Sequence, residues 1–303
     1  MSAESARALA LSLGANLGIA LAKFAVAGLT RSASMLTEAV HSSADCGNQV
    51  LLFLGMKQAQ KAPTRQHPLG RGQAAFVASF LVALLLFSVG GAYSVVEGIH
   101  KILRPEQPHH LGWAVSLLVF AFLLESVSLA GALRAAKAER GRRSLIQYMR
   151  DSSATELVVV LAEDAAALVG LILALIAVLL TWITGNAVWD GVGSVLIGFL
   201  LMAVAVFVGS EVTSLLLNEA PPLALRAKIR ALVAEDPDVE LVLNLIAVMI
   251  GSNRLMVSLQ VQFKNQPSGD ALVATINALE RRLKAAFPQI QHLFVEPDRR
   301  DEA

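Results

Sequence analysis

The chain has 303 residues, of which 55% are hydrophobic and only 16% are charged, and its formal net charge is +1 at pH 7. Soluble domains carry about a quarter charged residues, so this composition excludes an ordinary soluble fold. The near-neutral charge gives no reason to expect a nucleic-acid partner. The apolar residues gather into runs of about 20, the length that crosses roughly 30 Å of hydrocarbon. We therefore predict an integral membrane protein that lies in a lipid bilayer.

Six membrane spans are predicted, separated by short polar breaks or breaks marked by Gly and Pro. They are Leu9–Leu29, Ala33–Met56, Ala74–Val96, Leu111–Ala132, Leu157–Ile183 and Val188–Val208. Lys and Arg concentrate in the connections after the second and fourth spans, whereas the other side has only Arg31, Lys101 and Arg104 in its loops. The positive-inside rule then places both termini in the cytoplasm or its equivalent, and we expect the cell (inner) membrane.

The composition changes abruptly at Asn218–Pro222, and the remainder is typical of a small soluble module. Helical spacing and β-branched alternation predict the order αββαβ. The predicted elements are Leu223–Ala234, Val239–Val248, Arg254–Phe263, Gly269–Phe287 and Ile290–Glu296. We predict a transmembrane domain over residues 1–212 and a C-terminal domain over residues 213–303. A core this small gains from association with a second copy, so we expect a homodimer.

Charged residues inside the apolar spans need a reason to be there, because each costs roughly 2.5–3.5 kcal/mol at the bilayer centre. Glu38, His41 and Asp45 follow one another at offsets of three and four, which puts them on one face of the second span. The remaining charges are spread over four other spans: Lys23, Glu125, Glu163, Asp164 and Asp190.

His41 and Asp45 have the i, i+4 spacing that lets two side chains close on one metal ion. An imidazole with carboxylates suits zinc, whereas an all-oxygen set suits calcium, magnesium or manganese better. Glu163 and Asp164 point about 100° apart on a helix, so we expect one to be a ligand and the other a proton carrier or supporting acceptor. Asp164 is preferred because Gly170 lets another helix approach nearby. The alternative is that these groups only pair with one another, or with Lys23, to hold helices together.

Four segments together resemble the cation diffusion facilitator family, zinc transporters that exchange metal for protons. They are SMLTEAVHSSADCGNQVLLFLG in the second span, HPLGRG in the following loop, EDAAALVG in the fifth span and WDGVGSVLIG in the sixth. The αββαβ tail is also similar, so the resemblance covers nearly the whole chain. The Glu-Asp pair is most similar to the branch that contains the mitochondrial zinc exporter of animals.

The resemblance implies a six-helix transmembrane bundle with a ferredoxin-like or metallochaperone-like C-terminal dimerisation domain. It implies a transport site of His41, Asp45 and Asp164. The family's fourth ligand position falls on Val160, so either Glu163 or a water fills the gap or the site has three protein ligands. Candidates for a proton-linked or supporting role are Glu38, Asn48 and Asp190.

The function that follows from the residues and the resemblance is zinc efflux by alternating access in exchange for protons. The same scaffold could instead carry manganese, iron, cobalt or nickel, or could be a non-transporting membrane scaffold or sensor. An enzyme is not expected, because the sequence offers no nucleophile with a base in reach and no cofactor-binding loop. We therefore predict no catalytic residue and no bound cofactor.

Overall fold

The computed structural model describes residues 3–141, 144–152, 155–264 and 268–299. Contacts within the chain divide it into two compact units. The first unit comprises Met1–Gly55, Val77–Leu145 and Glu156–Val212, and the second comprises Met56–Phe76, Ile146–Thr155 and Thr213–Ala303. The units are described separately below.

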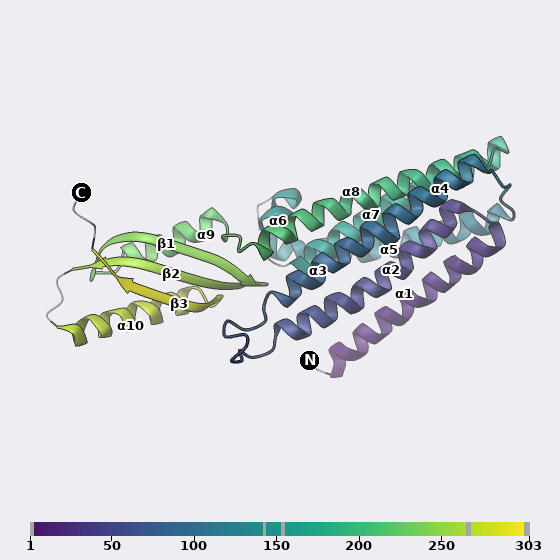
Figure 1. The fold of residues 1–303 in the computed structure, drawn as a ribbon. Coiled ribbons are helices and arrows are strands. Elements are labelled where there is room, and N and C mark those ends of the chain that lie inside the picture. Colours follow the sequence, from purple (N-terminus) through teal and green to yellow (C-terminus); the bar gives the residue numbers. More distant parts are fainter. Residues whose placement is uncertain (1–2, 142–143, 153–154, 265–267, 300–303) are drawn as a thin grey trace. The chain divides into compact units, whose positions relative to one another are not determined.

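Long helices that pack side by side form the first unit (Figure 1). Their bounds are α1 (Ala3–Thr30), α2 (Ala33–Ala59), α3 (Ala74–Leu85), the π-helical segment η1 (Leu86–Ala92), α4 (Tyr93–Leu103), α5 (Leu111–Arg140), α7 (Thr155–Thr184) and α8 (Val188–Leu216). Each predicted span lies inside one of these helices or, for the third span, inside the continuous run α3–η1–α4. The π-helical turn within that run was not predicted.

Four stretches of the described residues are long and apolar enough to cross a membrane: Ala74–Leu103, Leu111–Lys137, Leu157–Thr184 and Val188–Leu216. The chain is therefore an α-helical membrane protein, while the count of six spans stays a prediction. In α1, whose side chains the structure describes only from Asn16 onward, the described apolar stretch is Asn16–Thr30. The 27 residues of α2 are long enough, but its mean hydropathy is lower because polar side chains interrupt it.

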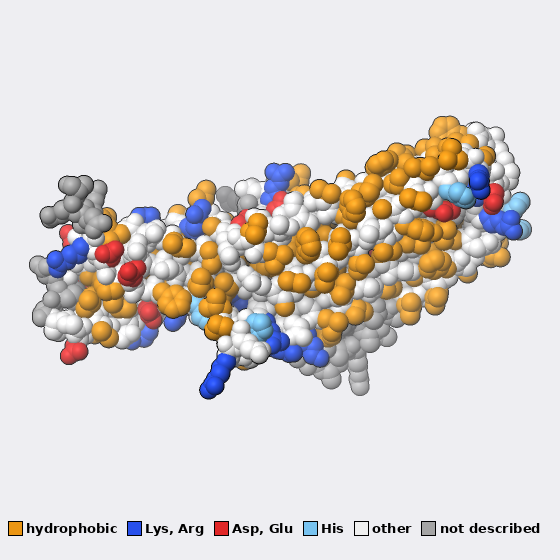
Figure 2. All heavy atoms as spheres, in the orientation of Figure 1, with side chains coloured by type: hydrophobic (Ala, Val, Ile, Leu, Met, Phe, Trp, Pro, Cys, Tyr) orange, Lys and Arg blue, Asp and Glu red, His pale blue; other side chains and the backbone are white. Residues whose placement is uncertain are grey.

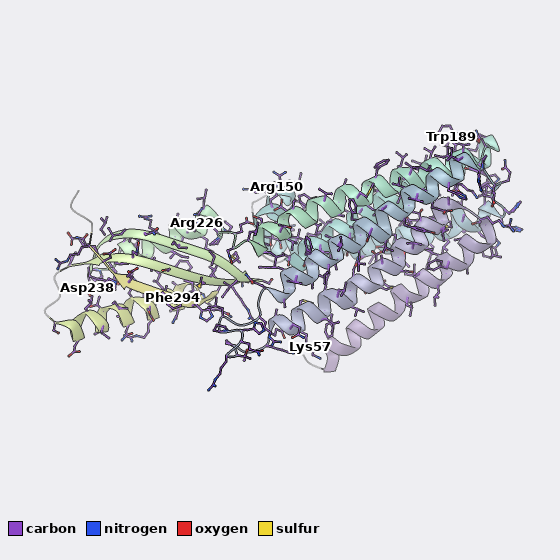
Figure 3. All side chains as sticks on the ribbon, viewed as in Figure 1. Lys57, Arg150, Trp189, Arg226, Asp238 and Phe294 are labelled. Carbon is purple, nitrogen blue, oxygen red and sulfur yellow. The ribbon has the colours of Figure 1, made fainter. Side chains whose placement is uncertain are left out.

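The surface of these helices is suited to lipid. Figure 2 shows hydrophobic side chains spread along the first unit, with charged and His side chains at the tip that carries the α4–α5 connection. Trp189, labelled in Figure 3 at the start of α8, is 40% exposed at the same tip. An apolar belt with an aromatic residue at its edge is the pattern expected at a membrane–water boundary.

Two pairs of glycines bring α8 into backbone contact with the α3–η1–α4 run. A Cβ on Gly98 would lie 2.7 Å from the Gly191 carbonyl oxygen, and a Cβ on Gly198 would lie 2.7 Å from the Gly91 oxygen. The pairs are seven residues apart on both helices. Small residues at such contacts let transmembrane backbones approach closely and gain packing energy in the absence of a hydrophobic driving force.

The second unit holds a three-stranded sheet in the order β1-β2-β3. Its elements are α9 (Leu223–Ala234), β1 (Val239–Gly251), β2 (Arg254–Phe263), α10 (Gly269–Ala286) and β3 (Ile290–Pro297). β1 and β2 pair antiparallel and β2 and β3 pair parallel. Helices α9 and α10 contact each other as well as the sheet, so they cover one face of it. This is the αββαβ order predicted from the sequence.

Alternation along β2 builds the core of this unit. Leu255, Val257, Leu259 and Val261 are all buried, and the residues between them are more exposed. The buried side chains of the helices include Ile229 in α9 and Leu283 in α10. Phe294 on β3, labelled in Figure 3, is 55% exposed.

The connection that follows α2 also belongs to the second unit. Arg254 donates a hydrogen bond to the Ala59 carbonyl oxygen at 2.9 Å, and the Gly72 and Gly251 backbones touch so closely that neither has room for a Cβ. The short helix α6 (Leu145–Asp151), which the sequence analysis did not predict, lies largely in this unit too.

We expect Gly98→Val to lower the stability of the full chain by about 1–3 kcal/mol, because the added methyls overlap the α8 backbone and force the helices apart. The measurement is the melting temperature of the detergent-solubilised protein. The control is Gly131→Ala in α5, where the new Cβ meets nothing within 4 Å and the helix propensity improves. Equal melting temperatures for the two variants would show that the glycine contacts do not hold α8 in place.

Candidate functional site

A cavity of about 130 Å³ lies among α1, α2, α5 and α7. Four carboxylic acids line it, and they come from three helices: Asp45, Glu125, Glu163 and Asp164. Four neutral polar side chains and several apolar ones also line it, the polar ones being Asn16, Ser42, Gln49 and Ser128. No lysine or arginine is among its lining residues within the described part of the chain. The cavity is therefore strongly acidic, which suits a cation.

Helix α2 provides a histidine next to this cavity. His41 is 2% exposed, and its Nδ1 lies 3.6 Å from Oδ1 of Asp45, one helical turn further along. Neither ring nitrogen of His41 has a hydrogen-bond partner among the described residues, and the same is true of Asp45 Oδ1. Buried polar atoms are nearly always bonded in proteins, so unpartnered atoms that face each other indicate a place for a ligand.

Both acids of the Glu-Asp pair in α7 reach the cavity despite their 100° separation. Glu163 is almost fully buried and accepts a hydrogen bond from Asn48 Nδ2 at 2.6 Å. Asp164 accepts one from Ser128 Oγ at 2.8 Å. Val160 lines the same cavity one turn before Asp164. Asn48 thus lies behind Glu163 rather than on the cavity wall.

Glu125 and Ser128 of α5 bring a third helix to the site. The sequence analysis noted Glu125 as a charge inside an apolar span but gave it no role. Its presence in an otherwise apolar stretch was the only available signal, because no other titratable residue stands near it in α5 to form a motif. Asn16 and Gln49 were missed as well, since uncharged amides in apolar helices are less conspicuous.

Glu38 does not line the cavity. Its Oε2 forms a buried ion pair with Lys23 Nζ at 3.1 Å, and the same ammonium donates to Ser42 Oγ at 2.7 Å. The alternative weighed from the sequence, that acids of the second span pair with Lys23, thus describes Glu38. Its other oxygen would lie 3.1 Å from a Cβ at Gly170, which places α7 close to α2 at this level.

Asp190 holds the start of α2. Its carboxylate accepts hydrogen bonds from Ser32 Oγ at 2.6 Å, from the backbone N–H of Ser34 at 3.2 Å and from the backbone N–H of Ala33. These are the unsatisfied donors of a helix N-terminus, where a negative charge is favoured. Ala33 and Asp45 are 12 residues apart, or about 18 Å along the helix. Asp190 therefore serves α2 far from the cavity.

The donors do not yet converge in this conformation. Among the described residues, no group of three His, Cys, Asp or Glu side chains lies close enough together to hold a metal ion. His41 and Asp45 face each other, and Asp45 shares the cavity with Asp164 and Glu163. Asn48 of α2 already contacts Glu163 of α7, so the two helices are in contact beside the cavity.

Comparisons with known proteins agree with this geometry. The cation efflux transmembrane domain matches residues 9–217, which is most of the chain. The mitochondrial proton-coupled zinc antiporter SLC30A9 is 33% identical in Xenopus laevis and 31% identical in Homo sapiens, in each case over 255 residues, or 84% of this chain. Metal tolerance protein C4 of Arabidopsis thaliana is 29% identical over 87% of this chain.

These relatives are longer proteins. The chain spans 44% of the length of the two antiporters and 58% of the plant protein. The match to the cation efflux domain nevertheless includes every helix that lines the cavity. This chain therefore belongs to the cation efflux family.

Proposed function

We propose that the chain transports a divalent metal ion, zinc first, in exchange for protons. The observation that carries this proposal is the pair of buried His41 and partly buried Asp45, with three polar atoms that have no partner among the described residues, beside a cavity lined by acids. An ion pair made only for stability would satisfy those atoms inside the protein. A site that must bind and release a cation leaves them free.

His41, Asp45 and Asp164 are the proposed ligands, and Glu163 is the candidate for a fourth. One imidazole nitrogen and several carboxylate oxygens form a donor set that zinc accepts. The hydrogen bonds from Asn48 to Glu163 and from Ser128 to Asp164 would orient these two carboxylates toward the ion. Glu38 and Asp190 hold helices instead, so we propose no direct contact of either with the metal.

Exchange follows from the chemistry of the donors. Metal binds the neutral imidazole and the ionised carboxylates, so protons and metal compete for the same atoms. Alternating access around such a site would admit metal from one side and protons from the other. The direction we propose is out of the cytoplasm.

Manganese is the rival cargo that the structure favours most. With Val160 in the cavity wall, the site lacks a second nitrogen donor and is dominated by oxygen, which suits harder cations such as manganese. Iron, cobalt and nickel remain alternatives on the same scaffold. A non-transporting scaffold or sensor is less well supported, because the cavity acids have no cationic partner among its described lining residues.

For the remainder of the molecule, we propose six spans with α1 and α2 included, and a transmembrane domain over residues 1–212. The basic residues after α2 would face the cytoplasm together with both termini. We propose a cell inner membrane, with a mitochondrial membrane as the alternative suggested by the names of the antiporter relatives. Residues 213–303 would form a ferredoxin-like domain that joins two copies.

Asp45→Asn and Asp164→Asn should each lower zinc flux by at least about tenfold, because an amide offers the ion a neutral oxygen in place of a charged one. The measurement is zinc entry into proteoliposomes driven by a pH gradient and reported by an internal dye. Glu97→Gln is the matched control, since this acid lies in α4 and does not line the cavity. Native flux in both aspartate variants would rule out the proposed site.

Val160→His should favour zinc over manganese by about tenfold in the ratio of kcat/KM, because it adds a nitrogen donor one turn before Asp164. The two metals are compared as competing substrates in the same vesicles. Val160→Leu controls for the change in size. An unchanged ratio in the histidine variant would show that residue 160 does not face the transported ion.

A further inference from the structure

Lys23 is a buried cation that has no role in the transport cycle proposed above. It is 1% exposed in α1, and of the described side chains in the long helices only one other lysine, Lys101, is also buried. The Lys23 ammonium contacts Glu38 at 3.1 Å and Ser42 at 2.7 Å, both of them in α2. An ammonium ion at membrane depth is costly, so its retention calls for an explanation.

A purely structural tether explains this pair poorly. Burying an ion pair removes both charges from water, and well-packed apolar residues of similar volume usually hold two elements together as well or better. The ammonium is also shared between Glu38 and Ser42, whereas a tether to Glu38 alone would hold α1 on α2. Ser42 lines the acidic cavity, so the second hydrogen bond draws the positive charge toward it.

The spacing along α2 shows which charge lies nearer the site. Ser42 is three residues from Asp45, a rise of about 4.5 Å, whereas Glu38 is seven residues away, a rise of about 10 Å. On α1, Asn16 and Ile19 line the cavity and Lys23 follows on the same helix face. The ammonium therefore lies at the edge of the cavity, with its counter-ion Glu38 on the side away from Asp45.

A fixed positive charge at that edge has two effects. It offsets part of the repulsion among the cavity acids when no metal is bound, and it repels a divalent ion when one is bound. Both effects lower the free energy gained on binding. A transporter benefits from this, because an ion held too tightly by several carboxylates is released slowly.

We propose that Lys23 sets the metal affinity of the acidic cavity, and that its charge keeps the site weak enough to release its cargo. Lys23 is a positioning residue in this role, since it acts on the ion through the field it places on Asp45 and not as a ligand. The inference rests on the proposed transport function, and it adds a residue outside the ligand set.

The test compares zinc uptake kinetics of the native chain with Lys23→Met in proteoliposomes. The Met variant should lower both KM and kcat for zinc, KM by at least about tenfold, because the repulsion is gone and release becomes slow. Zinc binding to the detergent-solubilised chain should tighten by a similar factor. Lys23→Arg, which keeps the charge, should restore the native values.

Two further variants separate this role from a tether. The double variant Lys23→Met with Glu38→Gln removes both charges of the ion pair, so Glu38 is not left as an unpaired buried charge that could cause misfolding. This variant should still lower KM, because the ammonium that it removes lies nearer to Asp45 than the Glu38 carboxylate does. Lys101→Met also removes a buried lysine, but one that binds the Arg31 carbonyl at the far end of α2, and it should leave KM unchanged.

If the double variant keeps the native KM and only its abundance or melting temperature changes, Lys23 is a tether and the inference is wrong. That result differs from a failure of the proposed function, in which the native chain itself would carry no metal. A lower KM together with a lower kcat in the double variant supports the inference, because loss of a tether does not tighten binding.

Discussion

An ionised side chain in hydrocarbon must be compensated by the protein or by what the protein binds, and this constraint orders the whole transmembrane unit. Asp190 is compensated by the N-terminal N–H groups of α2, and Glu38 by the Lys23 ammonium. Among the described residues, the donors to the cavity acids are neutral: Asn48 donates to Glu163 and Ser128 donates to Asp164. The compensated charges build the helix bundle, and the others leave a deficit of positive charge that a cation can fill.

The same polar contacts divide α2 into a fixed part and a freer part. Its first turns are tied to α8 by Asp190 and by the hydroxyl pair of Thr37 and Ser194 at 2.6 Å. Beyond them, Ser42, Asp45, Gln49 and Leu52 line the cavity, and several polar atoms of α2, among them both ring nitrogens of His41, have no hydrogen-bond partner among the described residues. A rearrangement around the cavity would therefore leave the start of α2 in place, because the glycine contacts also hold α8 against the α3–η1–α4 run.

Much of this architecture follows from local sequence. Apolar runs predicted the helices, and the alternation of apolar and polar residues predicted the strands of the C-terminal unit. The predicted elements of that unit agree with the observed ones within a few residues. The π-helical segment and α6 were missed because neither has a distinctive period or composition. Within the site, the i, i+4 spacing indicated His41 and Asp45. The place of Glu125 and the separation of Asp190 from the cavity depend on how helices pack, which a single sequence does not encode in any local pattern.

The charge balance of the cavity also bears on how exchange could work. Oxygen atoms that bind metal are the atoms that bind protons, so a carboxylate-rich site needs no separate proton path for the two to compete. Additional acids strengthen this competition, but they also raise the affinity of the site for the metal. The apolar Val160, where the family resemblance implies a fourth ligand, and the buried Lys23 ammonium both lower that affinity. A site with several acids, one imidazole and a neighbouring lysine can thus attract a divalent cation from water and still give it up.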